Sequence, residues 1–92
     1  MVAFDLERPW ALAPQVALRR ERFGALAYHF GTRRLTFLKT WTLVAVVDEL
    51  SEHPSARAAC LAAGVTNAEL PAYERALAGL AEKGLIAESS SQ

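Results

Sequence analysis

Apolar and polar residues alternate through the first half of the chain in a way that predicts β-strands. Residues 16–22 alternate, and Phe23-Gly24 offers a chain reversal after them. Two further strands, 25–30 and 33–38, flank Gly31-Thr32, and glycine at the first central position is typical of a type II′ hairpin. We therefore predict a three-stranded antiparallel sheet.

The predicted hairpin turn sets the register between the second and third strands. With Phe30 opposite Arg33, one face of the hairpin is apolar and the other is mostly polar. The apolar pairs are Tyr28 with Leu35 and Leu26 with Phe37; the other pairs are His29 with Arg34 and Ala27 with Thr36. Thr36 and Leu38 are expected to face outward. Because so small a sheet needs a helical layer, we predict that helices cover the apolar face.

A helical period replaces the alternation from about residue 40 onward. In the last third, Leu70, Tyr73, Leu77 and Leu80 recur at spacings of three, four and three, which favours one buried helical face. The predicted helices are 40–52, capped by Thr40; 55–63, capped by Ser55 and ended by Gly64; and a last one that begins between Thr66 and Pro71 and ends at Gly84.

The two ends are expected to be an extended arm and a frayed tail. Residues 1–15 contain Pro9 and Pro14 and are predicted to form an extended arm that Trp10 docks on the body. The serine-rich residues 88–92 are predicted to be a frayed tail. No repeat or linker divides the chain, and 92 residues correspond to one domain, so we predict a single domain over 1–92.

Composition changes the picture mainly by exclusion. An apolar content of 52% is that of a core-forming globular chain rather than a disordered one. Cys60 is the only cysteine, which excludes an internal disulfide and a multi-cysteine zinc site and fits a reducing compartment. No secretory signal is visible, and no stretch approaches the roughly 20 apolar residues of a membrane span. We therefore expect a cytoplasmic protein that does not insert into membranes.

Charge is balanced overall but divided along the chain. Residues 1–40 hold seven Lys and Arg against three Asp and Glu, and residues 41–92 hold three against seven. This balance argues against a general nucleic-acid binder, which needs a large phosphate-neutralising surface. It permits a local basic patch in the first half that meets an acidic peptide.

The residues needed for catalysis are not grouped in the sequence. His29 and His53 have no partner at metal-ligand spacing, and there is no glycine-rich phosphate loop, no CxxxCxxC cluster and no set of carboxylates on one face. We therefore predict a non-enzymatic protein with no catalytic residues, no metal site and no cofactor.

Four strings, spread over about residues 8–87, carry a resemblance to a known family. The chain resembles the MftB peptide chaperones of mycofactocin systems, which belong to the PqqD-like recognition elements for ribosomally made, modified peptides. The strings are WALAPQV over 10–16, FGALAYHFGTRRL over 23–35, HPSAR over 53–57, and Ala76-Leu77 leading to Leu80 and Gly84-Leu85. The string over 23–35 is the most specific of the four.

The resemblance implies a fold and a function. The fold is an α+β, winged-helix-like PqqD fold: a three-stranded antiparallel sheet followed by three helices, the last two in a helix-turn-helix arrangement. The function is that of a chaperone that binds the leader region of a short precursor peptide by β-strand addition and presents it to a radical S-adenosylmethionine (SAM) maturase, without doing chemistry itself. Precursors of this kind look acidic.

The resemblance also implies a binding site between the third strand and the third helix. Carried over onto this sequence, the leader adds to the edge of the third strand and lies in a groove walled by the last helix. The strand residues are Arg33, Arg34, Leu35, Thr36, Phe37 and Leu38, and the helix residues are Tyr73, Ala76, Leu77, Leu80 and Lys83. An edge strand has unpaired main-chain groups and suits this mode of binding. The same open edge exposes the chain to strand exchange, and so to a homodimer.

Several of these residues have an ordinary structural alternative. Leu35 and Phe37 are equally expected in a hydrophobic core, and for Leu77 and Leu80 the core is the favoured interpretation. Arg33 and Arg34 are also the kind of charges that protect a free strand edge from aggregation.

The whole domain has functional alternatives as well. One is a winged-helix DNA-binding protein, in which the helix from Pro71 to Lys83 would enter the major groove. The charges of Glu74, Arg75, Glu82 and Lys83 nearly cancel, whereas a reading helix presents cationic and amide side chains. DNA binding is therefore disfavoured. Another alternative is a structural subunit that docks on an enzyme without touching its substrate.

Overall fold

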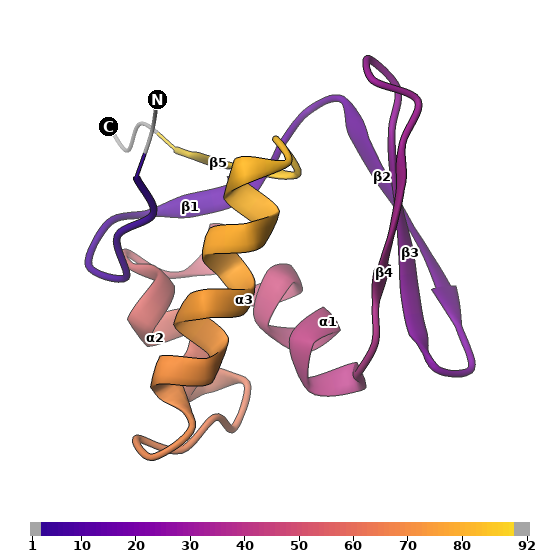
Figure 1. The fold of residues 1–92 in the computed structure, drawn as a ribbon. Helices are drawn as coiled ribbons and strands as arrows, with labels where there is room; N and C mark the ends of the chain where they lie inside the picture. The colour runs from indigo at the N-terminus through magenta and orange to yellow at the C-terminus, as the bar shows by residue number, and fades with distance from the viewer. Residues whose placement is uncertain (1–2, 90–92) are drawn as a thin grey trace.

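A computed structural model describes residues 3–89 as two small sheets and three helices (Figure 1). In chain order the elements are β1 (Trp10–Leu12), β2 (Val16–Glu21), β3 (Gly24–His29), β4 (Leu35–Leu38), α1 (Trp41–Glu49), the 3-10 turn η1 (Leu50–Glu52), α2 (Ala56–Ala62), α3 (Leu70–Glu82) and β5 (Ile86–Glu88). The α+β class, with a three-stranded antiparallel sheet ahead of three helices, is confirmed. Within the described part no helix has both the length and the apolarity to cross a bilayer.

The three-stranded sheet has the order β2-β3-β4, and its predicted register is confirmed. Tyr28 lies opposite Leu35 and Leu26 lies opposite Phe37. The predicted type II′ turn is wrong, because the left-handed residue of the loop is Arg33, with φ of 63°, and not Gly31. The Arg33 N–H donates to the carbonyl of His29 at 2.7 Å, so the loop is longer than two residues.

The prediction of which sheet face is covered is also wrong. Leu35 and Phe37 are 60% and 56% exposed, whereas Leu38, which was expected outside, is 1% exposed and belongs to the core. Thr36 is half-buried on the same inner face. The inner face carries small side chains such as Ala25 and Ala27, so α1 packs directly against β3 and β4. A close helix–sheet contact over small residues leaves the bulky residues on the outside.

The helices begin and end where the sequence predicts, with one refinement. Thr40 Oγ1 accepts from the Leu43 N–H at 3.1 Å, and Ser55 Oγ accepts from the Ala58 N–H at 3.1 Å. Both hydrogen bonds satisfy a first-turn amide of the following helix. The segment predicted as one helix over 40–52 is α1 followed by η1, and the last helix starts at Leu70.

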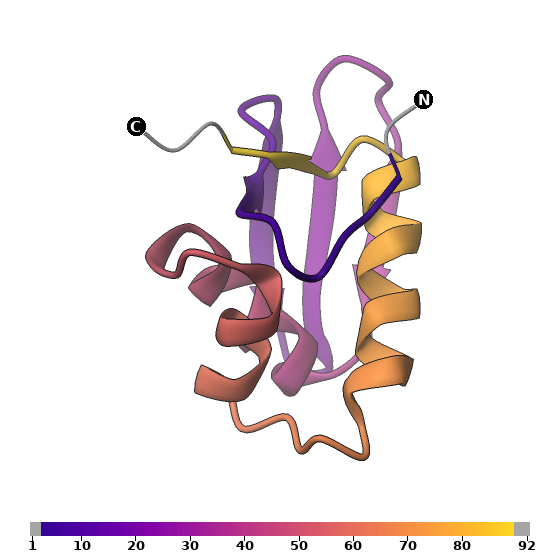
Figure 2. The ribbon, with the colours of Figure 1, turned by 90° about the vertical axis from the view of Figure 1, so that its left-hand side faces the viewer.

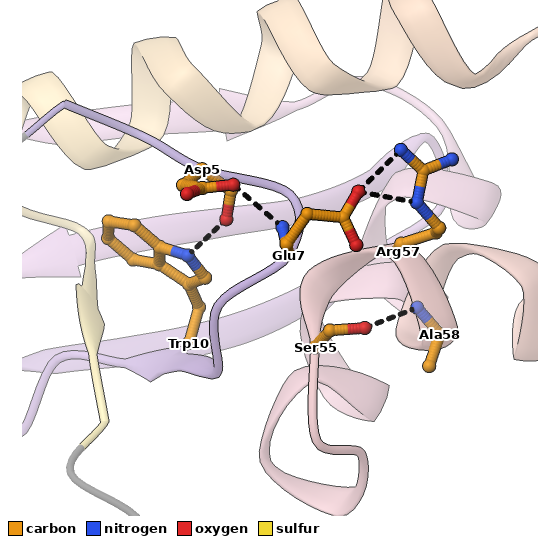
Figure 3. Close-up of polar contacts among 6 residues, drawn as sticks. All are labelled: Asp5, Glu7, Trp10, Ser55, Arg57 and Ala58. Carbon is orange, nitrogen blue, oxygen red and sulfur yellow. Dashed lines mark hydrogen bonds and ion pairs between the residues drawn. The ribbon is translucent and has the colours of Figure 1, made fainter.

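The N-terminal arm is held by β-pairing and by polar contacts, which the prediction of an extended arm did not include. β1 pairs antiparallel with β5, and Trp10, 1% exposed, docks the arm as predicted. Figure 3 shows the Trp10 indole N–H donating to the carbonyl of Asp5 at 2.9 Å, and Arg57 of α2 reaching Glu7 of the arm.

The C-terminal prediction is also wrong in part. The predicted tail 88–92 begins inside β5, where Glu88 lies opposite Trp10. Ser89 continues this contact, because its N–H donates to the carbonyl of Pro9 at 3.0 Å. The expectations for residues 1–2 and 90–92 lie outside the described residues. Figure 2 shows β5 crossing the upper part of the molecule in front of the three-stranded sheet.

One glycine is required where the β2–β3 hairpin meets the end of β4. Gly24 has φ of 152°, and a Cβ at this residue would lie 2.1 Å from the carbonyl oxygen of Leu38. A side chain here would force two strands apart at the point where β4 leads into α1.

We therefore expect Gly24→Ala to lower the free energy of unfolding by at least about 2 kcal/mol, since backbone strain and a main-chain clash combine. The matched control is Gly79→Ala in α3, where a Cβ meets nothing within 4 Å. That variant should raise the free energy of unfolding by about 0.5 kcal/mol, because alanine favours a helix interior. Urea denaturation measures both; equal stability of the two variants would contradict the proposed contact.

Candidate functional site

The outer edge of β4 has no β-partner among residues 3–89. β4 is the last strand in the order β2-β3-β4, so only β3 pairs with it. The His29 N–H donates to the carbonyl of Arg34 at 3.0 Å, which shows that Arg34 turns its carbonyl toward β3. Antiparallel pairing alternates from residue to residue. The N–H and C=O groups of Leu35 and Phe37 therefore point to the free edge.

The side chains of β4 divide between the two faces of the sheet. Thr36 and Leu38 lie on the inner face, and Leu35 and Phe37 lie on the outer face. Of the predicted strand residues, only Leu38 is a core residue. A strand added to this edge would alternate in the same way, with half of its side chains toward the helices and half away from them.

Two hollows lie beyond the two ends of β4, and each is lined in part by α3 or the residue that follows it. The hollow at the β3–β4 loop has a volume of about 420 Å³ and is lined by Thr32, Arg34, Glu82 and Lys83. The hollow at the start of α1 has a volume of about 290 Å³ and is lined by Thr40, Leu43, Ala72, Tyr73 and Ala76. α3 itself packs mainly against α2 and β5.

The predicted residues of α3 occupy different surroundings. Tyr73 and Ala76 line the hollow near α1, and Lys83 lines the hollow near the β3–β4 loop. Leu77 and Leu80 are buried in the hydrophobic core, at 0% and 6% exposure. The structure thus places three of the five helix residues in the two hollows, and brings one of them, Lys83, together with Arg34.

Sequence reasoning missed several residues that line the two hollows. These are Thr32, Thr40, Leu43, Ala72 and Glu82. A signal for two of them was present, because Ala72 lies four residues before Ala76 on one helical face and Glu82 adjoins Lys83. Nothing in the helical period of α1 singles out Leu43 from the core residues around it.

His29 organises the loop that carries Arg33 and Arg34. Its Nδ1 atom accepts hydrogen bonds from the backbone N–H groups of Gly31 and Thr32, at 3.0 and 3.1 Å. Both amides would otherwise face solvent at the tip of the hairpin. The imidazole therefore sets the shape of the loop that precedes the free edge.

The described residues do not form a metal cluster or an activated nucleophile. Among residues 3–89, no three His, Cys, Asp or Glu side chains are close enough to hold a metal ion. Burial raises the pKa of Cys60, so its thiol is held protonated, which opposes nucleophilic chemistry. His53 contacts Glu49 at 2.8 Å, an i,i+4 pair at the end of α1. The surface beside β4 offers binding groups instead.

We expect His29→Phe to accelerate amide hydrogen exchange at Gly31 and Thr32 by about fivefold, because each lost hydrogen bond contributes roughly 1 kcal/mol. The phenyl ring keeps the bulk of the side chain and removes its acceptor. His53→Phe is the matched control, since it removes the other histidine far from the loop in sequence and should leave these two amides unchanged. Identical exchange in wild type and His29→Phe would show that the ring does not hold the loop.

Comparison with known proteins gives one consistent result. Residues 9–87 match the family model described as the peptide chaperone MftB family. A protein named peptide chaperone MftB from Mycobacterium ulcerans is 57% identical over 84 residues, covering 91% of this chain and 77% of the relative. Proteins of the same name from Mycobacterium tuberculosis and Mycolicibacterium smegmatis are 51% and 48% identical, covering 90% and 92% of this chain and 76% and 83% of theirs. Among solved structures there is no significant match.

Proposed function

This chain belongs to the peptide chaperone MftB family, and from that premise we propose that it binds the leader of a mycofactocin-type precursor peptide as a fourth strand on β4. The observation that supports this mode is the free outer edge of β4, with the main-chain groups of Leu35 and Phe37 directed away from β3. Main-chain pairing supplies affinity in such complexes, and pockets for alternate side chains supply specificity.

The two hollows beyond the ends of β4 support the same proposal. A peptide strand paired with Leu35 and Phe37 would run from the hollow at Arg34 and Lys83 to the hollow at Leu43 and Tyr73. Its inward side chains would meet a polar, partly cationic end and an apolar end. This polarity would fix the direction of the peptide as well as its register.

Charge favours an acidic ligand at the loop end. Within residues 3–89, Arg33, Arg34 and Lys83 form no ion pair, although Glu82 lines the same hollow as Lys83. Unpaired cations at an exposed site accelerate encounter with an acidic peptide more than they strengthen the final complex. The rival function, DNA binding through α3, gains no support from a helix whose exposed charges include Glu74 and Glu82.

The chaperone would hold the peptide for an enzyme that carries out the chemistry. We propose a radical SAM maturase as that enzyme, acting in the cytoplasm on a leader-bound precursor. The domain itself would contribute binding and orientation only, which agrees with the naming of its relatives as chaperones rather than enzymes.

We expect Arg33→Glu combined with Arg34→Glu to weaken binding of a labelled acidic leader peptide about tenfold at physiological salt, because attraction becomes repulsion at the loop end. The matched control, Arg19→Glu with Arg22→Glu, makes the same charge change on and beside β2, at the far side of the sheet, and should change the peptide Kd by less than about twofold at physiological salt.

The measurement is a fluorescence anisotropy titration, with duplex DNA over a salt series in parallel. DNA binding should be weak and lost as salt rises. Equal losses for both charge variants would show that net charge, and not the β4 end, attracts the peptide.

Strand addition itself is tested by comparing Leu35→Pro with Leu35→Ala. Both variants remove an exposed side chain, but only proline removes the N–H that the free edge presents. We expect Leu35→Pro to bind the leader peptide about fivefold more weakly than Leu35→Ala, the loss of one net hydrogen bond. Circular dichroism should report the same fold for both. Equal affinities would exclude main-chain pairing at this residue.

A further inference from the structure

The exposed apolar residues of the protein are concentrated on and around one surface, the outer face of the β2-β3-β4 sheet. Of the six large hydrophobic residues described as exposed, five lie on this sheet or at its ends and only Leu61 lies elsewhere. The five are Phe23, Phe30, Leu35, Phe37 and Trp41, with exposures from 45% to 60%. In Figure 1 this face is turned to the right, away from all three helices. A gathering of exposed apolar residues on one face is typical of an interaction site.

The aromatic residues of this outer face are ordered by contacts with one another. The rings of Phe23 and Phe37 are 5.6 Å apart, and those of Tyr28 and Phe30 are 5.4 Å apart in an edge-to-face arrangement. Trp41 is fixed at the lower end of the sheet, because its indole N–H donates to the carbonyl of Arg22 at 3.0 Å. A preformed aromatic surface loses little side-chain entropy when a partner covers it.

The rim of the outer face is positively charged. Arg22 and Lys39 lie at the end near Trp41, and Arg33 lies in the loop at the opposite end. None of these three residues forms an ion pair within residues 3–89. Arg19, on the face itself, is paired with Glu21 at 2.8 Å.

This charge pattern decides which kind of partner fits. A second copy stacked on the face by a two-fold axis would bring cationic ends against cationic ends, and like charges across an interface oppose association. A partner with an apolar centre and carboxylates at its rim is complementary to both the apolar face and its cationic rim.

We propose that the outer face of the β2-β3-β4 sheet is the docking surface for the enzyme that modifies the bound peptide, and that this enzyme presents an apolar patch with an acidic rim. The inference rests on the proposed function. The inference adds two points to the proposed function: which surface of the chaperone the enzyme contacts, and the chemistry of the surface that the enzyme must offer.

The position of the free edge explains how one surface would serve both partners. A peptide strand added to β4 extends the sheet, and every second side chain of that strand then lies on the outer face beside Leu35 and Phe37. The enzyme would contact a combined surface made by chaperone and peptide. It would therefore bind the loaded chaperone more tightly than the empty one.

The test uses the full chain, an acidic leader peptide and the purified radical SAM maturase of the same system. Leu26→Thr with Tyr28→Thr alters the outer face on the central strand, away from the β4 edge, with a residue that suits a strand. We expect this variant to weaken maturase binding at least about tenfold, as loss of central apolar contacts does, while the peptide Kd changes less than about twofold. Leu61→Thr, on α2, is the matched control and should change neither affinity.

Each alternative outcome separates one hypothesis from another. If the double variant also loses peptide binding, Phe23→Thr in the exposed β2–β3 turn replaces it with the same expected result. Unchanged maturase binding in a variant that still binds peptide would overturn the docking inference and leave the proposed function standing. Failure of the wild type to bind any leader peptide would overturn the proposed function, and the inference with it.

Self-association and charge give two further measurements. If the wild type sediments as a dimer and Leu26→Thr with Tyr28→Thr sediments as a monomer, the outer face binds a second copy and the proposal is overturned.

The charge of the rim is tested separately. Arg22→Glu with Lys39→Glu should weaken maturase binding, and rising salt should weaken wild-type binding, because the rim attraction is electrostatic. Affinity that is independent of both would exclude an acidic rim on the partner.

Discussion

The close approach of α1 to the inner face of the three-stranded sheet is the constraint on which the rest of the structure depends. Ala25 and Ala27, both buried, present almost no side chain between the strands and the valines of α1. A small residue is also required at Gly24, beside the end of β4, because the carbonyl of Leu38 leaves no room there for a Cβ. Because cores are close-packed, small residues in the sheet and branched residues in the helix fill this layer together.

This packing decides what the outside of the sheet can do. Alanine occupies the inner positions of β3, and the bulky side chains of β4, Leu35 and Phe37, lie on the outer face, where no other part of this domain buries them. The free edge has a separate cause, because β4 is the last strand in the order β2-β3-β4 and α3 packs mainly on α2 and β5.

The sequence predicts the elements well and their orientation poorly. The helix caps at Thr40 and Ser55 and the helix end at Gly64 depend only on residues close by in the sequence, so they can be predicted without knowing the tertiary structure. The choice between the two sheet faces is a tertiary decision: Leu35 and Phe37 look like core residues until the volume of the opposite face is known. The pairing of β1 with β5 joins residues nearly 80 positions apart. Periodicity carries no information about such contacts. At the candidate site, Lys83 and Tyr73 were suggested by resemblance, whereas the role of the His29 ring depends on loop geometry.

The antiparallel pairing of β1 with β5 affects how this domain can be joined to other polypeptides. Pairing of Trp10 with Glu88 brings the two ends of the described chain together, on the side of the molecule away from β4 (Figure 1). A flexible tether attached at either end would leave the sheet unobstructed. Tethering a domain beside its partners raises their local concentration without any new contact. The fold is therefore suited to work as a module within a larger polypeptide as readily as on its own.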